Sequence, residues 1–270
     1  MPETTGVVGT DYRMRDADER VVGTVAMVLG HHLPGMVHAV AVRSPHPHAR
    51  ILDIDTSEAA AAPGVLATLT GADLDADPGV DPWFGAQRAD QPVLCIGTAR
   101  YNGDPVALVV AETATQAREA ALLVDVDYEE LPYVVDEIEA AADGAVAVHD
   151  GQPGNVCGSW RLRHGDVERG LEQADRVYDA VYHSPPASHV PMEPHVAVGR
   201  WVDGRCEMWT SAQAPHAVRT GLEEMFALGP GGAVVRTLNL GGAYGAKGQI
   251  KIEPMVACAA RACGRPVRME

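Results

Sequence analysis

The chain has 270 residues, of which 46% are hydrophobic, and 21 basic against 37 acidic residues give it a formal net charge of −16. This apolar content excludes a disordered protein, and the acidity argues against nucleic acid or an anionic membrane as a partner. Apolar runs fall short of the ~18 residues that a membrane helix requires, and residues 1–5 lack the features of a secretion signal. We therefore expect a cytoplasmic protein. Five scattered cysteines are too few for a disulfide framework.

Residues 20–141, after an N-terminal extension of residues 1–19, are predicted to form a first domain of strands mixed with one or two helices. Apolar, β-branched or alternating stretches predict strands at 36–42, 51–55, 106–110 and 124–128. The run 106–110 is apolar throughout, which is typical of a strand buried on both faces. A short helix is predicted at 113–123, with Ala117, Ala121 and Val124 on one stripe. The mixture indicates an α+β fold.

Residues 142–158 are rich in glycine and have little periodicity, which predicts a linker before a second domain at 159–270. That domain is predicted to contain strands at 206–210 and 233–240 and helices at 215–228 and 253–263. The first of these helices has Pro215 in its first turn. It places four apolar side chains on one face, namely Val218, Leu222, Met225 and Phe226.

The end of the sequence indicates that the second domain is incomplete. Gly264 directly follows the last predicted helix and Pro266 comes two residues later, which is the usual order of these residues at the C-terminus of a helix. A new strand then begins at Val267, three residues before the sequence ends. We expect a split gene, a processed subunit or an artificial chain end.

A glycine-rich loop at 241–248 follows the strand predicted at 233–240 and precedes the last helix. Such an arrangement presents backbone N–H groups and the positive end of a helix to an anion. The loop is not a P-loop, because Ala246 and Gly248 flank Lys247 where that motif requires Gly and Ser or Thr, and it does not match G-x-G-x-x-G. From the pattern alone, a tight turn without a ligand is equally consistent with these glycines.

Several segments, in order along the chain, resemble the large subunit of the molybdenum hydroxylases, the xanthine dehydrogenase/aldehyde oxidase family. Residues 241–247 are similar to its G-G-G-[FY]-G-x-K loop, residues 210–216 to its T-S-x-Q-x-P-H segment and residues 192–194 to its M-E-P element. Residues 163–166 resemble a G-D turn of the family, and residues 33–38, 43–51 and 101–107 resemble its hammerhead domain. The likeness is greatest to the carbon monoxide dehydrogenase-like branch and covers only the N-terminal half of the family's subunit.

The resemblance implies an α/β hammerhead domain followed by the first part of a molybdopterin-binding α+β domain. It also implies a molybdenum–molybdopterin cofactor, with a cytosine dinucleotide form as one option. Gln213 would hydrogen-bond an oxygen ligand of molybdenum, and no residue would ligate the metal directly. The residues that would line the cofactor belong to the glycine loop and are Gly241, Gly242, Ala243, Tyr244 and Gly245.

The implied reaction is the hydroxylation of a carbon next to nitrogen or oxygen, such as that of an aldehyde or an N-heterocycle, with water as the oxygen source. FAD and [2Fe-2S] clusters are expected on partner subunits, and a further partner chain is expected to carry the C-terminal half of this subunit. The family's general base is a glutamate in that half, so the resemblance assigns no base here, neither Glu193 nor Glu253. Gly248 replaces a glutamate of purine-oxidising members, which argues against purine oxidation, although the carbon monoxide dehydrogenase-like branch also lacks that acid.

Other interpretations remain open at this stage. His46 and His48 have a spacing that a zinc site can use, but no Cys or acidic partner lies at ligand spacing, which favours a structural role. Cys258 and Cys263 fit the buried side of a helix better than an iron–sulfur motif. For the whole chain, the alternatives to a catalytic part are a non-catalytic scaffold or assembly subunit and an inert truncation.

Overall fold

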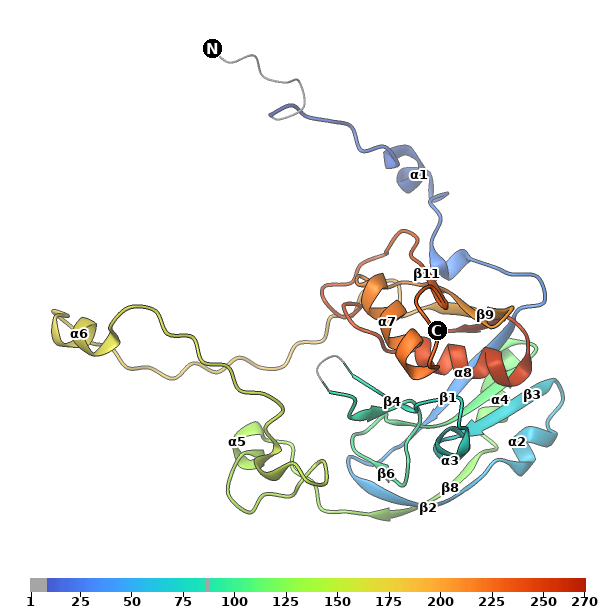
Figure 1. Cartoon of the computed structure of the whole chain (residues 1–270), viewed down its shortest axis with the longest axis horizontal. Coiled ribbons are helices and arrows are strands. Elements are labelled where there is room, and N and C mark those ends of the chain that lie inside the picture. The colour runs from blue at the N-terminus through green and yellow to red at the C-terminus, as the bar shows by residue number, and fades with distance from the viewer. Residues whose placement is uncertain (1–8, 86–87) are drawn as a thin grey trace.

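The computed structural model describes residues 9–85 and 88–270, and its centre is a seven-stranded mixed sheet (Figure 1). Strands from both predicted regions share this sheet, because β12 lies between β9 and β1 and pairs with β1 in parallel at Val37 and Val267. In spatial order the strands are β11 (Ala233–Arg236), β10 (Arg205–Thr210), β9 (Ala197–Val202), β12 (Val267–Met269), β1 (Val37–Arg43), β7 (Pro105–Ala111) and β3 (Val65–Thr70).

Two smaller sheets complete the strand structure of the described residues. They are a three-stranded sheet of β6 (Thr98–Ala99), β2 (Ala49–Asp55) and β8 (Asp125–Glu130), and a hairpin of β4 (Trp83–Phe84) and β5 (Gln91–Pro92). The hairpin lies beside α7 in the fold, because the backbone N–H of Asp81 donates to the carbonyl of Met225 at 2.7 Å. This contact connects the first region to the second.

The helices are short. The first region contains α1 (Ala17–Val22), the 3-10 helix η1 (Val28–Gly30), α2 (Ser57–Ala61), α3 (Gly71–Ala76), α4 (Ala114–Ala121) and α5 (Glu137–Ala140). After these come the 3-10 helix η2 (Pro153–Asn155), α6 (Val167–Glu172), α7 (Pro215–Met225) and α8 (Glu253–Cys263). No helix among residues 9–85 and 88–270 is long and apolar enough to cross a membrane.

The main core lies where α7 and α8 cover the large sheet. Residues 253–260 of α8 are all buried, and the helix packs on β9 and β12. All seven residues of β7 are buried, which confirms the predicted buried strand; β7 is an inner strand of the sheet, and both α4 and α8 pack against it. One hydrophobic cluster joins Val37 and Leu108 of the first region to Leu222 and Val256 of the second. The mixed elements confirm the α+β class.

Each predicted element is present in the structure, and only two of the predicted ends differ from the observed ones by more than two residues. The helix predicted at 215–228 ends at Met225, and the strand predicted at 233–240 ends at Arg236. The strand is shorter because Asn239 turns toward the N-terminal segment, where its N–H donates to the carbonyl of Ala26 at 3.1 Å. In α4 the buried residues are Ala117 and Ala120, not the predicted stripe of Ala117, Ala121 and Val124, because the helix ends at Ala121.

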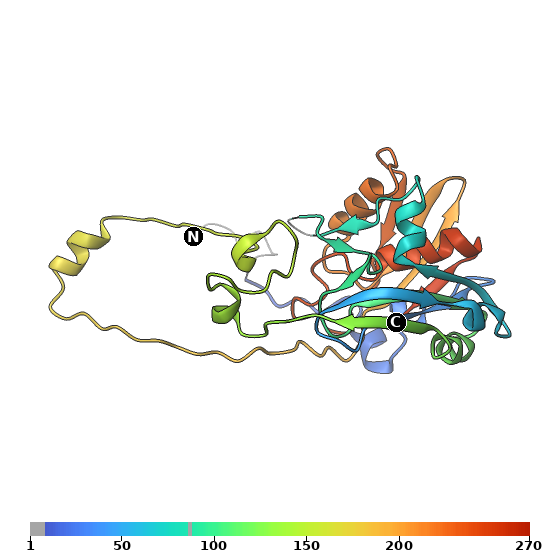
Figure 2. The same cartoon turned by 90° about the horizontal axis from the view of Figure 1, so that it is seen from below.

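A long excursion separates β8 from β9. Residues 136–155 form a small unit around Asn155, whose side chain bonds the backbone of three residues, Ala140, Val146 and Val148. The chain then runs out to α6 and back, and Figure 2 shows this stretch, yellow to orange, projecting away from the rest of the molecule. We call residues 156–192 the arm. The domain boundaries expected at 141 and 158 stay predictions.

Candidate active site

The glycine loop at 241–248 lies on the molecular surface and is shaped by left-handed backbone conformations. The φ angles of Gly242, Tyr244 and Gly245 are +100°, +53° and +94°. Two internal turns stabilise the loop, with the N–H of Ala246 donating to the carbonyl of Ala243 at 2.9 Å and the N–H of Gly248 to that of Gly245 at 3.2 Å. A left-handed tyrosine costs about 1 kcal/mol, so the surrounding structure must hold Tyr244 in this conformation. Turns of this kind form backbone concavities that bind anions.

A buried ion pair fixes both ends of this loop. Lys247 Nζ lies 2.8 Å from Glu193 Oε2, and the two side chains are 0% and 2% exposed. The same carboxylate oxygen accepts the backbone N–H of Gly241 at 3.0 Å, and the carbonyl of Gly241 accepts the N–H of Glu193 at 3.3 Å. Glu193 therefore connects the first residue of the loop to its lysine, and the opposite charges neutralise each other within the protein.

Gly241 has a steric role in this arrangement. A Cβ atom at this position would lie 2.7 Å from Glu193 Cβ and 2.7 Å from Met27 Cε. Only glycine therefore lets the loop approach the Glu193 backbone this closely. The second carboxylate oxygen of Glu193, Oε1, is buried and has no hydrogen-bond partner among the described residues.

Gln213 lies at the other end of the loop. The strand β10 ends at Thr210 and α7 begins at Pro215, so Gln213 belongs to the short turn between them. Its backbone N–H donates to the carbonyl of Lys247 at 2.7 Å, and its side chain is exposed. A Cβ on Gly248 would lie 3.9 Å from Gln213 Oε1, so the amide is adjacent to the end of the loop.

His195 adds a further contact that holds the loop. Its Nε2 atom lies 3.0 Å from the carbonyl oxygen of Ala246, and Ser211 holds the neighbouring backbone by accepting the N–H of Val196 at 3.1 Å. Three segments, 193–196, 211–213 and 241–248, are thereby joined by hydrogen bonds. The predicted residues Gln213 and Gly241 through Gly245 thus belong to one local unit. How they contact a cofactor stays a prediction.

Glu253 does not belong to the exposed surface of this unit. Its carboxylate accepts the hydroxyl of Thr210 at 2.5 Å and the backbone N–H of Lys251 at 2.8 Å, and the residue is buried. This acid lies in the first turn of α8, beyond Gly248. The partial positive charge at the N-terminus of α8 is therefore compensated by the Glu253 carboxylate and is not directed at the glycine loop.

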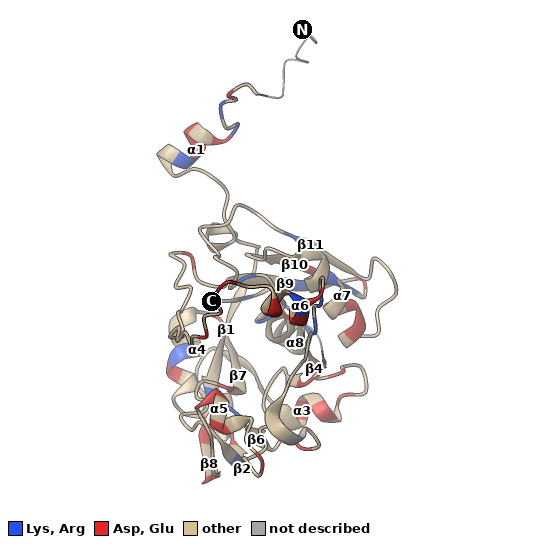
Figure 3. Cartoon of the chain, turned by 90° about the vertical axis from the view of Figure 1, so that its left-hand side faces the viewer, with Lys and Arg blue, Asp and Glu red and all other residues tan. Residues whose placement is uncertain are grey.

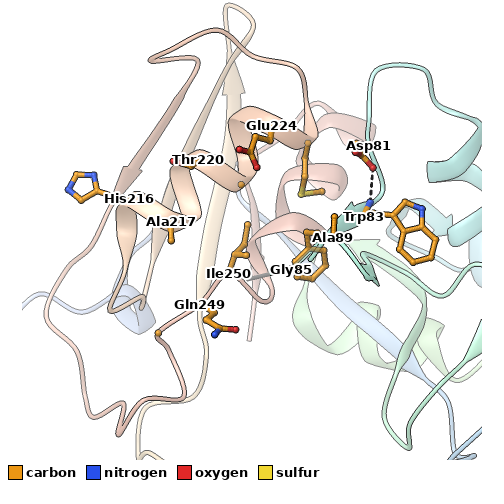
Figure 4. Close-up of a pocket in the computed structure, with 14 residues that line it drawn as sticks. Asp81, Trp83, Gly85, Ala89, His216, Ala217, Thr220, Glu224, Gln249 and Ile250 are labelled. Carbon is orange, nitrogen blue, oxygen red and sulfur yellow. Dashed lines mark hydrogen bonds between the residues drawn. The ribbon is translucent and has the colours of Figure 1, made fainter. Parts of the chain in front are cut away.

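A cavity of about 630 Å³ opens next to Gly248. Figure 4 shows its walls, which come from the β4–β5 hairpin, from α7 and from residues 248–250. Gly221 on α7 lets the helix lie close to Ile250, because a Cβ at this position would be only 2.9 Å from Ile250 Cδ1. The cavity and Gln213 thus share Gly248 as a neighbour.

The histidines and cysteines considered for metal binding have other contacts. His46 packs edge-on against Tyr128, with ring centroids 4.9 Å apart, and His48 Nδ1 lies 2.7 Å from the carbonyl of Pro132. Among residues 9–85 and 88–270 no group of three or more His, Cys, Asp or Glu side chains is arranged to hold a metal ion. Cys258 is buried on α8 as predicted, and burial raises the pKa of its thiol to about 12. Cys263, near the end of the same helix, is half-buried.

Sequence reasoning missed the Glu193–Lys247 pair. Each residue belongs to a motif, Glu193 to the M-E-P element and Lys247 to the end of the glycine motif, but the two are 54 residues apart. One signal in the sequence could have indicated the pair. Lys247 ends a glycine loop that is not a phosphate-binding motif, so a buried lysine there requires an acidic side chain as its partner.

Comparison with protein families accounts for both regions. Residues 23–132 match the model of the aldehyde oxidase and xanthine dehydrogenase a/b hammerhead domain, and residues 148–270 match that of the molybdopterin cofactor-binding domain. The chain belongs to the xanthine dehydrogenase/aldehyde oxidase family. This membership confirms the resemblance drawn from the ordered motifs.

Individual relatives agree with this membership. The chain is 32% identical over 97% of its length to a probable xanthine dehydrogenase subunit of Bacillus subtilis, and it covers 35% of that protein. It superimposes on 34% of the crystal structure of quinoline 2-oxidoreductase from Pseudomonas putida 86, with 97% of this chain covered, 33% identity and a TM-score of 0.86. It is 30% identical over 97% of its length to the nicotinate dehydrogenase large molybdopterin subunit of Eubacterium barkeri, of which it covers 61%. The chain thus spans about a third of the first two proteins and less than two thirds of the third.

Proposed function

We propose that this chain is the N-terminal part of the catalytic subunit of a molybdenum hydroxylase and that it forms one wall of the molybdopterin site. The observation that carries the proposal is the glycine loop, held by Glu193 and Lys247 and joined to Gln213 by the backbone. This unit lies within residues 148–270, the part that matches the molybdopterin cofactor-binding domain.

The residues of the loop fit a bulky anionic cofactor. Gly242 and Gly245 have no side chains that would fill the space at the turn. A Cβ on Gly242 would lie 3.4 Å from the Tyr244 ring, and a Cβ on Gly245 would lie 3.7 Å from His189 Nε2. The nearest buried acid, Glu193, is neutralised by Lys247, so it does not repel an anion at the loop. Backbone N–H groups and a neutral amide thus form the polar surface of this wall.

When bound, a molybdenum pyranopterin would supply the two-electron oxidation and the transfer of an oxygen atom from water to a carbon next to nitrogen or oxygen. Within this chain, the side-chain amide of Gln213, which is exposed, would donate a hydrogen bond toward the cofactor's acceptors. The glycine loop would orient the group, and Tyr244, whose side chain is 74% exposed, would cover it from the solvent side.

Neither buried acid near the site suits the role of general base. Glu193 is held by Lys247 and Gly241, and Glu253 is held by Thr210 and Lys251. A base must reach the proton that it removes, and both carboxylates are engaged inside the protein. We therefore assign the base to polypeptide outside this chain, as the resemblance implies.

The arm supports a partner that supplies this missing part. Its apolar side chains are strongly exposed, with Leu162 at 97%, Tyr182 at 91% and Tyr178 at 82%. The run 177–182 is apolar or aromatic except for Asp179, a sequence pattern typical of a strand covered on both faces, and its valines and tyrosines are all exposed. Such a surface is costly to leave in water, so we infer that the rest of the subunit covers the arm.

The other features of the proposal come from the family resemblance. FAD and [2Fe-2S] clusters would reside on further partner subunits, a cytosine dinucleotide would extend the pterin, and the assembly would reside in the cytoplasm. Substrates would be aldehydes or N-heterocycles. The E. barkeri relative, named a large molybdopterin subunit, is a protein of which this chain covers 61%, so the family includes short subunits.

The experiment is co-expression of the full chain with a polypeptide carrying the remaining part of the subunit, followed by elemental analysis for molybdenum and an assay of turnover. We expect bound molybdenum, and we expect Gln213→Ala to reduce turnover by about 10²-fold while the assembly still forms. Gln152→Ala, which changes an amide outside the site, is the matched control and should retain turnover. An assembly without molybdenum, or unchanged turnover in Gln213→Ala, would instead favour the scaffold alternative.

A further inference from the structure

The cavity beside Gly248 has a lining that selects for charge. Its ionisable side chains apart from His216 are two acids, Asp81 before the β4–β5 hairpin and Glu224 on α7. No lysine or arginine is among the described residues that line it. A concave site with two carboxylates and no fixed positive charge attracts cations and repels anions.

Aromatic side chains supply the second feature of the cavity. Trp83 and Phe84 are among the residues that line the cavity on the hairpin side, and Phe84 is buried. Aromatic faces bind flat molecules by stacking and attract cations through the ring quadrupole. The volume of about 630 Å³ lies within the range of small-molecule sites.

The acids are not neutralised by the basic residues of the neighbouring helices. Arg219 on α7 lies 3.8 Å from Glu223, and the Arg261 guanidinium of α8 donates to the carbonyl of Gly79 at 2.8 Å. Asp81 is held in place, because its Oδ1 accepts the backbone N–H of Trp83 at 3.0 Å. Figure 3 shows further acidic positions on α3 and α7.

The cavity also reaches the candidate active site. Gly248 lines it, and a Cβ on Gly248 would lie 3.9 Å from Gln213 Oε1. The cavity and Gln213 therefore adjoin at Gly248, which has no side chain. Gln249 and Ile250 continue the wall from the loop.

We propose that this cavity admits the substrate and selects planar heterocycles that carry a positive charge, with Asp81 and Glu224 as specificity-determining residues and Trp83 and Phe84 as the aromatic part of its lining. The inference rests on the proposed function for its link to catalysis. The preference of the cavity for cations depends on residues of this chain and is measured by binding, separately from turnover and molybdenum content.

The test compares two molecules of nearly equal shape, the 1-methylquinolinium cation and neutral 1-methylnaphthalene. Their binding to the full chain, co-expressed as above, is measured by titration calorimetry at low and at high salt. We expect the cation to bind about tenfold more tightly at low salt, and the preference to shrink as salt is added. The double variant Asp81→Asn/Glu224→Gln should bring the two affinities within about twofold of each other, because amides keep the shape and remove the charge.

A matched control separates the cavity from the general acidity of the chain. Glu58→Gln/Asp125→Asn removes the same charge from exposed positions of the first region that do not line the cavity. It should keep the full preference for the cation. Equal binding of the two probes by the unmodified protein, no measurable binding of the cation, or equal loss of preference in both double variants would overturn the inference.

The two proposals fail in different ways. An assembly that contains molybdenum but shows no preference for the cation leaves the proposed function standing and removes the selectivity. An assembly that prefers the cation but contains no molybdenum keeps the cation site and removes the catalytic proposal.

Discussion

Removing the charge of Lys247 is expected to destabilise the protein far more than removing a surface charge. Lys247→Met keeps most of the side-chain volume but leaves the Glu193 carboxylate buried beside a single remaining donor, the N–H of Gly241. Two charges 2.8 Å apart attract each other by about 6 kcal/mol at an effective dielectric constant of about 20. The cost of taking both charges out of water offsets part of this attraction, so we expect the free energy of unfolding to fall by about 3–5 kcal/mol.

The double variant Glu193→Gln/Lys247→Met should lose much less than Lys247→Met alone, because no uncompensated charge stays buried. Urea unfolding of the co-expressed assembly, followed by circular dichroism, gives the free energies. Arg50→Met is the control. It breaks the exposed ion pair with Glu129, which contributes under about 1 kcal/mol. The reasoning is refuted if Lys247→Met costs no more than Arg50→Met, or if the two substitutions at the buried pair are simply additive.

Three further predictions concern the loop, a helix and a strand. Gly241→Ala should lower the free energy of unfolding by about 1–3 kcal/mol, because the new Cβ meets Glu193 and Met27 at 2.7 Å; an unchanged urea midpoint would contradict this. In the folded chain at pH 8, iodoacetamide should modify the exposed Cys157 and spare Cys258, whose pKa burial raises to about 12; mass spectrometry showing equal labelling would count against it. Hydrogen bonding to Arg200 lowers the pKa of Glu207, so this carboxylate adds stability above its ordinary pKa that is lost as the pH falls through its folded pKa. Glu207→Gln should therefore destabilise the protein more at pH 7 than at pH 3, and an equal effect at both pH values would exclude the mechanism.

The parts of the fold that the sequence predicted well are those that local patterns determine. The four apolar residues on one face of α7, Val218, Leu222, Met225 and Phe226, are all buried, and α8 begins at Glu253 and ends at Cys263 as predicted. Gly264 adopts the left-handed conformation that ends such a helix. In each case spacing and capping residues within one segment carry the information.

The parts that escaped prediction depend on contacts between distant segments. No local pattern indicates that β12 inserts between β9 and β1, because this placement depends on how both regions pack together. The strand predicted up to residue 240 stops at Arg236 because the segment around Ala26 takes the next backbone hydrogen bond. The Glu193–Lys247 pair likewise joins two segments that the sequence analysis treated as separate motifs.

The most direct test of the central claim is the molybdenum content of the co-expressed assembly after a bulky side chain has been added to the glycine loop. Gly245→Val places a branched side chain on the loop at a φ of +94°, and Gly231→Val imposes the same kind of strain at +81° in a turn away from the loop. We predict near-stoichiometric molybdenum in the unmodified assembly and in Gly231→Val, and little in Gly245→Val, with all three assembling equally. Equal molybdenum in the two variants, or none in the unmodified assembly, would contradict the claim that this loop forms a wall of the cofactor site.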